Sequence, residues 1–313
     1  MKATDAVGCI GAATVLFFAS ALIPLIGPFF GLLTPLPYLY YSTKLGLYEG
    51  LKISLITLLF LSLISYWAGQ PQMIILCLEF TFLGLILSEL YRRKLTIGHT
   101  VLWGTGLMLL TGFTVLVLVG WSMNAGPLEL AAAFLESNLK EASRVYDHVG
   151  LNDMNTAQIE EQVRALRDMI FKIYPALLTI GTGSVVWANI MISRPLFRMG
   201  HLPYPDFGPL ERWQAPELLI WGVIASGFSL FLPIGAVKYL AINVLVVLLV
   251  LYVFHGLSIL LFYLKRYQIP AWVRIGIYVL MIFQQFLLVA VAMAGLFDQW
   301  IDFRRLHIRR VSQ

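Results

Sequence analysis

Five polar side chains interrupt long apolar stretches of this sequence, and they are the residues best placed to do chemistry. They are Glu79, Asn243, His255, Gln284 and Gln285. An ionisable or amide group surrounded by apolar sequence is costly unless it faces a cavity, a partner group or a pathway. We therefore predict that these side chains help to bind a small-molecule ligand, with the last four along one polar seam between neighbouring helices.

Glu79 is the clearest of these positions. It lies inside the apolar run from Met73 to Leu90 and has no basic residue within one helical turn. A carboxyl group in that setting must be protonated, paired across helices or in contact with water. A role in ligand binding and a structural hydrogen bond between helices both stay open for Glu79.

No pattern for nucleotide hydrolysis or metal binding accompanies these residues. The chain contains no Gly-Lys dipeptide, so the phosphate-binding loop G-x-x-x-x-G-K-[ST] is absent. The zinc pattern H-E-x-x-H is absent as well, and the 5 histidines lie in different segments. We expect no metal, no cofactor and no enzymatic activity, and an ATP-driven role would need a second protein.

The elements that hold these residues are expected to be membrane helices. Of the 313 residues, 59% are hydrophobic and only 12% are charged, whereas soluble proteins have about a quarter charged residues. A lipid solvent accepts apolar side chains on the outside of a helical bundle. The sequence therefore predicts an all-α polytopic transmembrane bundle that contacts the lipid bilayer, and the net charge of +5 reflects loop topology rather than nucleic-acid binding.

Apolar runs along the chain predict about eight or nine spans, because most approach the ~20 residues that a bilayer core requires. The second run is short and contains two prolines, so it is expected to be a short or re-entrant helix. The runs are Ala6–Ile26, Phe29–Tyr41, Gly46–Trp67, Met73–Leu90, Ile97–Met123, Ile173–Ile192, Leu218–Leu232, Tyr239–Leu264 and Ile275–Phe297.

A polar gap separates the membrane helices into two groups. The gap holds eight of the 17 acidic residues, and its apolar residues recur at three- and four-residue steps, which predicts an extramembrane helical hairpin with a turn at Gly150–Asn155. Either its charged faces are solvated and its apolar stripes pack together, or it is a lid or a docking element. The expected parts are N-terminal helices 1–123, the hairpin 124–172, C-terminal helices 173–297 and a basic tail 298–313.

Lysine and arginine positions indicate sidedness, because cytoplasmic loops are enriched in both. Nine alternating spans from a cytoplasmic N-terminus place most of these residues inside, but they place Lys238 and the arginine-rich tail outside. That conflict leaves the side of the C-terminus open. The residues predicted to be cytoplasmic are Lys2, Lys44, Lys52, Arg92, Arg93, Lys94, Arg194, Arg198, Arg212, Lys265, Arg266 and Arg274.

The last apolar run ends in the sequence GLFDQWIDFR, which contains Asp298, Trp300, Asp302 and Arg304. This ending resembles the Gly-Leu-x-Asp-x-Trp-x-Asp-Phe-Arg pattern of the YybS-like family of uncharacterised bacterial membrane proteins. An early Pro-Leu-Pro at Pro35 and the His255-Gly-Leu step are similar too, although glutamine is more usual in place of that histidine.

The resemblance implies a multi-pass protein of the bacterial inner membrane. The family is distantly similar to the substrate-binding S subunits of energy-coupling-factor importers, which implies ligand capture and a coupling protein as partner. Those subunits often carry an Ala-x-x-x-Ala step on the first helix, and this chain has only Gly8 and Ala12 at that spacing.

The residues themselves leave the end motif open. Asp298 and Asp302 are four residues apart on a helix and so share a face. In one interpretation the two carboxylates bind a cation. In the other, Asp302 pairs with Arg305 and Trp300 anchors the helix end at the membrane interface. The second interpretation is favoured because a metal site needs more oxygen ligands than two aspartates supply.

Two functions therefore remain as hypotheses. The first is a protein that binds or transports a small molecule. The second is a membrane scaffold that recruits an assembly or regulatory partner through the acidic hairpin or the basic tail.

Overall fold

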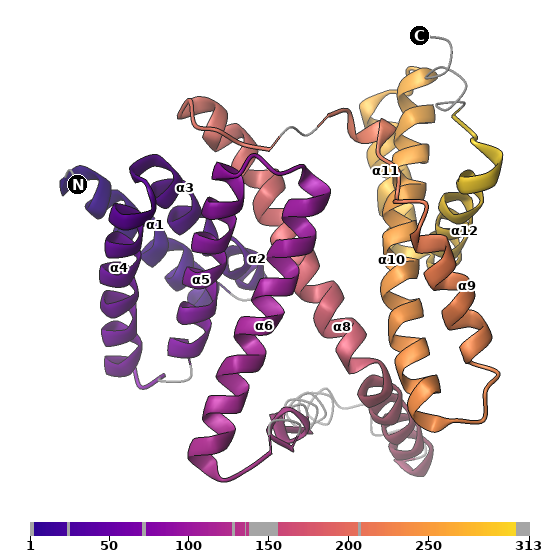
Figure 1. The fold of residues 1–313 in the computed structure, drawn as a ribbon, viewed down its shortest axis with the longest axis horizontal. Coiled ribbons are helices and arrows are strands. Elements are labelled where there is room, and N and C mark those ends of the chain that lie inside the picture. Colours follow the sequence, from indigo (N-terminus) through magenta and orange to yellow (C-terminus); the bar gives the residue numbers. More distant parts are fainter. Residues whose placement is uncertain are drawn as a thin grey trace. The chain divides into compact units, whose positions relative to one another are not determined.

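All regular structure in the described residues of this computed structural model is helical, as the sequence predicts (Figure 1). The chain divides into two compact units, and each is described by itself. The first comprises Met1–Gly150 and Gly181–Asp206, and the second comprises Leu151–Ile180 and Phe207–Gln313. The described residues are 3–23, 26–70, 73–126, 129–134, 136–137, 156–205 and 208–304.

Six helices in the described part of the chain are long and apolar enough to cross a membrane, and a bent helix pair makes a seventh only if it counts as one span. The prediction of about eight or nine spans is not confirmed, because three of the apolar runs form short or broken helices. The six are α1 (Ala3–Leu22), α4 (Leu47–Trp67), α5 (Met73–Arg92), α6 (Ile97–Met123), α8 (Thr156–Met199) and α10 (Gly235–Arg266).

The first unit packs α1, α4 and α5 around a short, proline-containing helix. The run 29–41 forms α2 (Gly27–Leu32) and most of α3 (Pro35–Leu45). Gly84 of α5 lies directly against the backbone of α3, so that a Cβ at this position would meet the carbonyl oxygen of Pro35 at 2.8 Å. The core beside this crossing consists of Cys9, Ala13, Phe17, Tyr38, Ile53, Leu61 and Cys77.

One end of the first unit collects the start of α1 and the ends of α3, α5 and α8. Lys44 of α3 donates to Asp5 of α1 at 2.7 Å, and Arg92 of α5 donates to the carbonyl oxygen of Ser42 at 3.1 Å. The Tyr91 hydroxyl of α5 bonds the Ser193 hydroxyl of α8 at 2.7 Å. These contacts bring Lys44 and Arg92, two of the residues predicted to be cytoplasmic, to the same end of the unit.

The second unit is built around α10. The short helix α9 (Leu219–Ser229) covers the run 218–232 and packs antiparallel to α10, because Ile220 clusters with Tyr252 while Gly222 faces Leu248. The helical turn η1 (Leu210–Arg212) precedes α9, and a stretch without regular structure connects the two.

The last apolar run is broken into α11 (Ala271–Phe283) and α12 (Gln285–Ile301), which differ in direction by 105°. At about 1.5 Å per residue, these 13- and 17-residue helices are roughly 20 and 26 Å long, so neither spans a ~30 Å bilayer core alone.

Contacts along α10 show that α12 runs parallel to it. Gly295 lies against Tyr252, and further along both helices the Tyr263 hydroxyl donates to the carbonyl oxygen of Phe303 at 2.8 Å. The chain therefore enters after Arg266, turns at Gln284 and returns to the end of α10 from which it started (Figure 1). This geometry is that of a re-entrant helix pair.

The re-entrant pair removes the conflict over the C-terminus. If the run Ile275–Phe297 crosses the membrane, Arg304 lies on the opposite side of the membrane from Lys265 and Arg266. In the folded chain these residues lie at the same end of the second unit, since Glu211 contacts both Lys265 and Arg304. The positive-inside rule assigns that end to the cytoplasm.

The middle of the predicted hairpin 124–172, residues 138–155, lies outside the described residues, and so does the predicted turn at Gly150–Asn155. Where the chain is described again, α8 begins at Thr156 and continues without interruption through the expected boundary at Lys172.

Topology gives the first testable prediction. A fluorescent protein that matures only in the cytoplasm, fused after Tyr267 or after Gln313, should be bright in both positions, because α11 and α12 return to the same side. A fusion of a phosphatase active only outside should work after Ile234. Opposite results for Tyr267 and Gln313 would show that the pair crosses the membrane.

Candidate functional site

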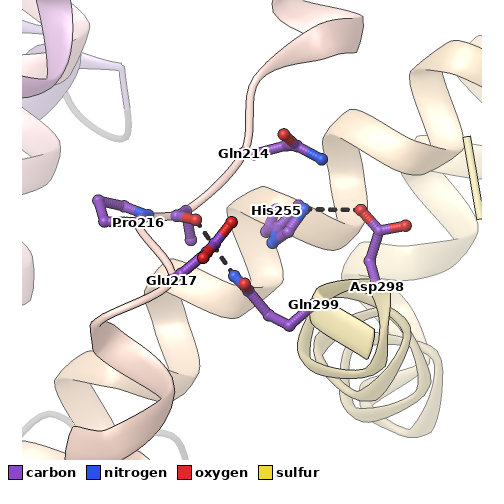
Figure 2. Close-up of a pocket in the computed structure, with 7 residues that line it drawn as sticks. Gln214, Pro216, Glu217, His255, Asp298 and Gln299 are labelled. Carbon is purple, nitrogen blue, oxygen red and sulfur yellow. Dashed lines mark hydrogen bonds and ion pairs between the residues drawn. The ribbon is translucent and has the colours of Figure 1, made fainter. Parts of the chain in front are cut away.

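A pocket of about 310 Å³ in the second unit gathers polar side chains from three elements (Figure 2). The stretch before α9, the helix α10 and the helix α12 each contribute to its wall. In Figure 2 Glu217 lies on the side of the His255 imidazole opposite Asp298, and Gln214 and Gln299 lie above and below the ring. The lining residues are Gln214, Ala215, Pro216, Glu217, His255, Asp298 and Gln299.

Two glycines bring α10 and α12 close enough to build this site. A Cβ at Gly256 would collide with the carbonyl oxygen of Val291, and one at Gly295 would collide with the carbonyl oxygen of Tyr252. Small residues permit such approaches between membrane helices, where lipid supplies no hydrophobic driving force for association. The crossing places His255 beside Asp298.

His255, Asp298 and Arg304 form a buried three-membered cluster. Their exposed fractions are 1%, 1% and 3%. The Asp298 Oδ2 atom lies 2.9 Å from Arg304 Nη2 and 3.0 Å from His255 Nε2, while these two nitrogens are 3.0 Å apart. A buried carboxylate and guanidinium stabilise each other only if both remain paired.

The backbone after α12 turns sharply so that Arg304 reaches Asp298. Asp302 ends the helix with a left-handed φ of 44°, and the Phe303 N–H donates to Asp298 Oδ1 at 2.8 Å. Short polar residues such as aspartate adopt this conformation more readily than most.

Arg304 also fixes the stretch that leads into α9. Its Nη1 atom donates to the carbonyl oxygens of Glu211 and Trp213 at 2.9 and 3.1 Å, and to the Ser258 hydroxyl at 2.8 Å. Ser258 is within reach of the Trp213 carbonyl as well, at 2.9 Å. The residues that follow Trp213 are therefore held against α10, which shapes the pocket.

An ion pair at the surface closes this end of the unit. Lys265 donates to Glu211 at 2.9 Å. Partial burial raises the pKa of the Glu211 carboxyl, but the hydrogen bond from Lys265, a backbone hydrogen bond and nearby positive charges outweigh it, and the pKa lies below its usual value.

The pocket surface is rich in hydrogen-bond acceptors. Gln299 donates its amide N–H to the carbonyl oxygen of Ala215 at 3.1 Å, which leaves its own amide oxygen available. The Nδ1 atom of His255 is buried and has no partner among the described residues. The site is suited to hold a small polar molecule.

Comparison with known proteins agrees with this architecture. The sequence pattern of a family described as "Predicted membrane protein (DUF2232)" matches residues 11–299. The chain belongs to this family. It is also similar to the uncharacterised protein YybS of Bacillus subtilis (strain 168), with 20% identity over 288 residues that cover 90% of each chain. No solved structure matches the chain.

The contacts in the second unit give the end motif a structural explanation. Asp298 and Arg304 form the buried pair, Asp302 provides the turn between them, and Trp300 is 60% exposed, as expected of an interfacial anchor. The described residues contain no group of three or more His, Cys, Asp or Glu side chains suited to a metal ion.

Of the five residues predicted from sequence to bind a ligand, only His255 lines the pocket. Glu79 belongs to the first unit, where it is half-buried and close to Gly112 of α6. Gln284 and Gln285 lie at the break between α11 and α12 and are exposed. Their predicted role in binding stays a prediction.

Asn243 instead bridges α8 at its proline. Its amide oxygen accepts from the Ala176 N–H at 2.9 Å, and its amide nitrogen donates to the carbonyl oxygen of Lys172 at 2.8 Å. A regular helix joins those two backbone groups to each other. Pro175 lacks an N–H and crowds the preceding turn, so the inserted amide satisfies groups that the proline disturbs.

Sequence reasoning missed Gln214, Glu217 and Gln299. Two of them lie in a polar, proline-containing stretch that resembles any solvated loop, and Gln299 lies within the end motif without an assigned role. The signal available was the spacing: Gln214 and Glu217 flank Ala215-Pro216 immediately before an apolar run.

The buried pair gives a prediction about stability. Asp298→Asn should lower the free energy of unfolding by about 3–5 kcal/mol, because it leaves the Arg304 guanidinium buried without a counter-charge. Thermal or denaturant unfolding of the purified protein in detergent measures the change. Glu217→Gln is the control and should cost less than about 1 kcal/mol, since this exposed carboxylate forms no hydrogen bond or ion pair within the described ranges. Equal losses would contradict the role of the pair.

The contact of Asn243 with α8 gives a second prediction about stability. Asn243→Ala should cost about 1–3 kcal/mol, the usual penalty for a polar group left unsatisfied. In a Pro175→Ala background the same change should cost less, because α8 can then form its regular backbone hydrogen bonds. A double-mutant cycle in detergent measures the coupling. Identical costs in both backgrounds would show that the amide does not serve the proline.

Proposed function

We propose that this protein captures a small polar solute within the membrane. The observation that carries the proposal is the pocket of about 310 Å³ that His255 lines, together with the buried Nδ1 atom of this residue, which has no partner in the described chain. Small-molecule sites have volumes of about 300–1,000 Å³ and a few polar groups that fix the ligand. This pocket lies at the small end of that range, which favours a metabolite-sized ligand.

The broken pair α11–α12 supports a transport-type role. Interrupted helices are tolerated at membrane depth where they line a cavity or are covered by protein, and transporters use them to build substrate sites. Here α12 is the returning half, and it supplies Asp298 and Gln299 to the pocket wall.

The proposed role is binding rather than catalysis, in the cytoplasmic membrane of a bacterium. The similarity to a Bacillus subtilis protein and the apolar helices support this location. The sequence has no phosphate-binding loop, so active uptake would require a coupling protein to supply the energy.

The proposal predicts a bound solute. A small polar metabolite should copurify with the full-length protein, and His255→Ala should retain at least about tenfold less of it, since a hydrogen bond in a buried site is worth that factor. Mass spectrometry of metabolites released from equal amounts of folded protein measures the difference, and a melting curve verifies folding.

Two matched controls use the other residues predicted from sequence. Glu79→Gln and Gln285→Ala change polar groups that do not line the pocket and should retain the solute. Loss of the solute in either control, with retention in His255→Ala, would place the site elsewhere. A folded wild-type protein that neither retains a solute nor takes one from a cell extract would contradict the proposal.

A further inference from the structure

Two carboxylates, and neither lysine nor arginine, line the pocket. The charge of Asp298 is balanced by Arg304, which is buried behind it at 2.9 Å. Glu217 is exposed, and its carboxylate forms no hydrogen bond or ion pair within the described ranges. The nearby Lys265 is engaged by Glu211. The negative charge of Glu217 is therefore the one left facing the pocket.

The geometry of the buried cluster assigns the proton of His255. Because the three sides of the cluster measure 2.9–3.0 Å, the angle at Arg304 Nη2 is about 60°, half of the ~120° between its two N–H bonds. An N–H bond aimed straight at Asp298 leaves the second N–H about 60° away from the direction of His255 Nε2, and the charged carboxylate of Asp298 is the stronger acceptor.

Asp298 has room for a second donor, and the Nε2 atom of His255 is placed to be that donor. A proton on Nε2 leaves Nδ1 of the neutral imidazole as an acceptor. This acceptor is the buried nitrogen that has no partner among the described residues. A ligand that reaches it must offer an N–H or O–H group.

The remaining polar side chains of the pocket wall can also accept hydrogen bonds. The amide oxygen of Gln299 is available because its N–H group is engaged by Ala215. Gln214 makes no hydrogen bond within the described part of the chain, and its amide can turn the oxygen toward the ligand. The fixed side-chain atoms of the pocket wall therefore mainly accept hydrogen bonds, and the donors it offers are neutral amide N–H groups, the second one of Gln299 and those of Gln214.

We propose that the pocket binds a small organic cation, a protonated amine, with Glu217 as counter-ion and His255 Nδ1 as a hydrogen-bond acceptor. This inference rests on the solute-binding function proposed above. A carboxylate or phosphate ligand would face the negative charge of Glu217, with neutral amide N–H groups and no lysine or arginine on the pocket wall to hold it. A bare metal ion such as Ca²⁺ takes about 6–8 oxygen ligands, more than this wall supplies.

Three two-carbon probes of similar size and different charge test the inference. Ethanolamine, ethylene glycol and glycolate are titrated into the full-length protein in a neutral detergent, and the dissociation constants are measured by NMR or calorimetry. Ethanolamine should bind at least about tenfold more tightly than ethylene glycol, because a charge-assisted hydrogen bond exceeds a neutral one. Glycolate should not bind.

Matched variants separate a direct contact from the general effect of charge. Glu217→Gln should weaken ethanolamine binding at least about tenfold and leave ethylene glycol unchanged. Glu211→Gln removes the same charge from the same stretch but not from the pocket wall, so it should leave both affinities unchanged. Equal effects of the two variants would overturn the role of Glu217.

The outcomes also separate this inference from the proposed function. Binding of ethylene glycol or glycolate as tight as that of ethanolamine, lost in His255→Ala, would overturn the charge of the ligand and keep solute binding. Failure of all three probes beside a copurified solute that is not an amine would overturn the amine alone. Failure of all three without any copurified solute would overturn both.

Discussion

The fold of the second unit depends on one buried ion pair, between Asp298 and Arg304. Neither charge is tolerated alone in an interior that excludes water, so the two residues must meet in the folded protein. The guanidinium carries more donors than one carboxylate uses, and the surplus goes to the carbonyls of Glu211 and Trp213 and to Ser258. One arginine thus joins the end of α12, the middle of α10 and the stretch before α9.

This pair acts together with close helix packing. Gly256 and Gly295 remove the side chains that would separate α10 from α12, and the approach puts His255 within hydrogen-bond distance of Asp298. Packing and polar contacts are the main forces between helices in lipid, since burial from lipid gains little. Asn243 illustrates the same rule at α8, where an amide compensates for Pro175.

The sequence predicted the local features of this protein well, because they depend on neighbouring residues. The apolar runs are largely helical where they are described, and Lys44 and Arg92 lie at helix ends that meet. The reversal within Ile275–Phe297 could not be predicted from hydropathy, because the run is apolar throughout except at Gln284 and Gln285. Two consecutive amides can cap a break or simply sit in a helix.

The site was only partly predictable for a related reason. His255 is conspicuous because it lies in an apolar run, but its partners Asp298 and Arg304 are 43 and 49 residues away. Glu217 looks like any solvated acid until the fold places it beside a buried imidazole. The composition of a loop does not indicate which helices the loop will contact.

The dependence of the pocket on Arg304 also has a consequence for the order of assembly. The carbonyls of Glu211 and Trp213 receive their charged donor from a residue that the ribosome adds 93 and 91 residues later. The stretch that carries Gln214 and Glu217 can take its final course only after α10 is inserted and α12 has returned alongside it. During synthesis, therefore, the helices of this unit form first and the pocket wall is completed last.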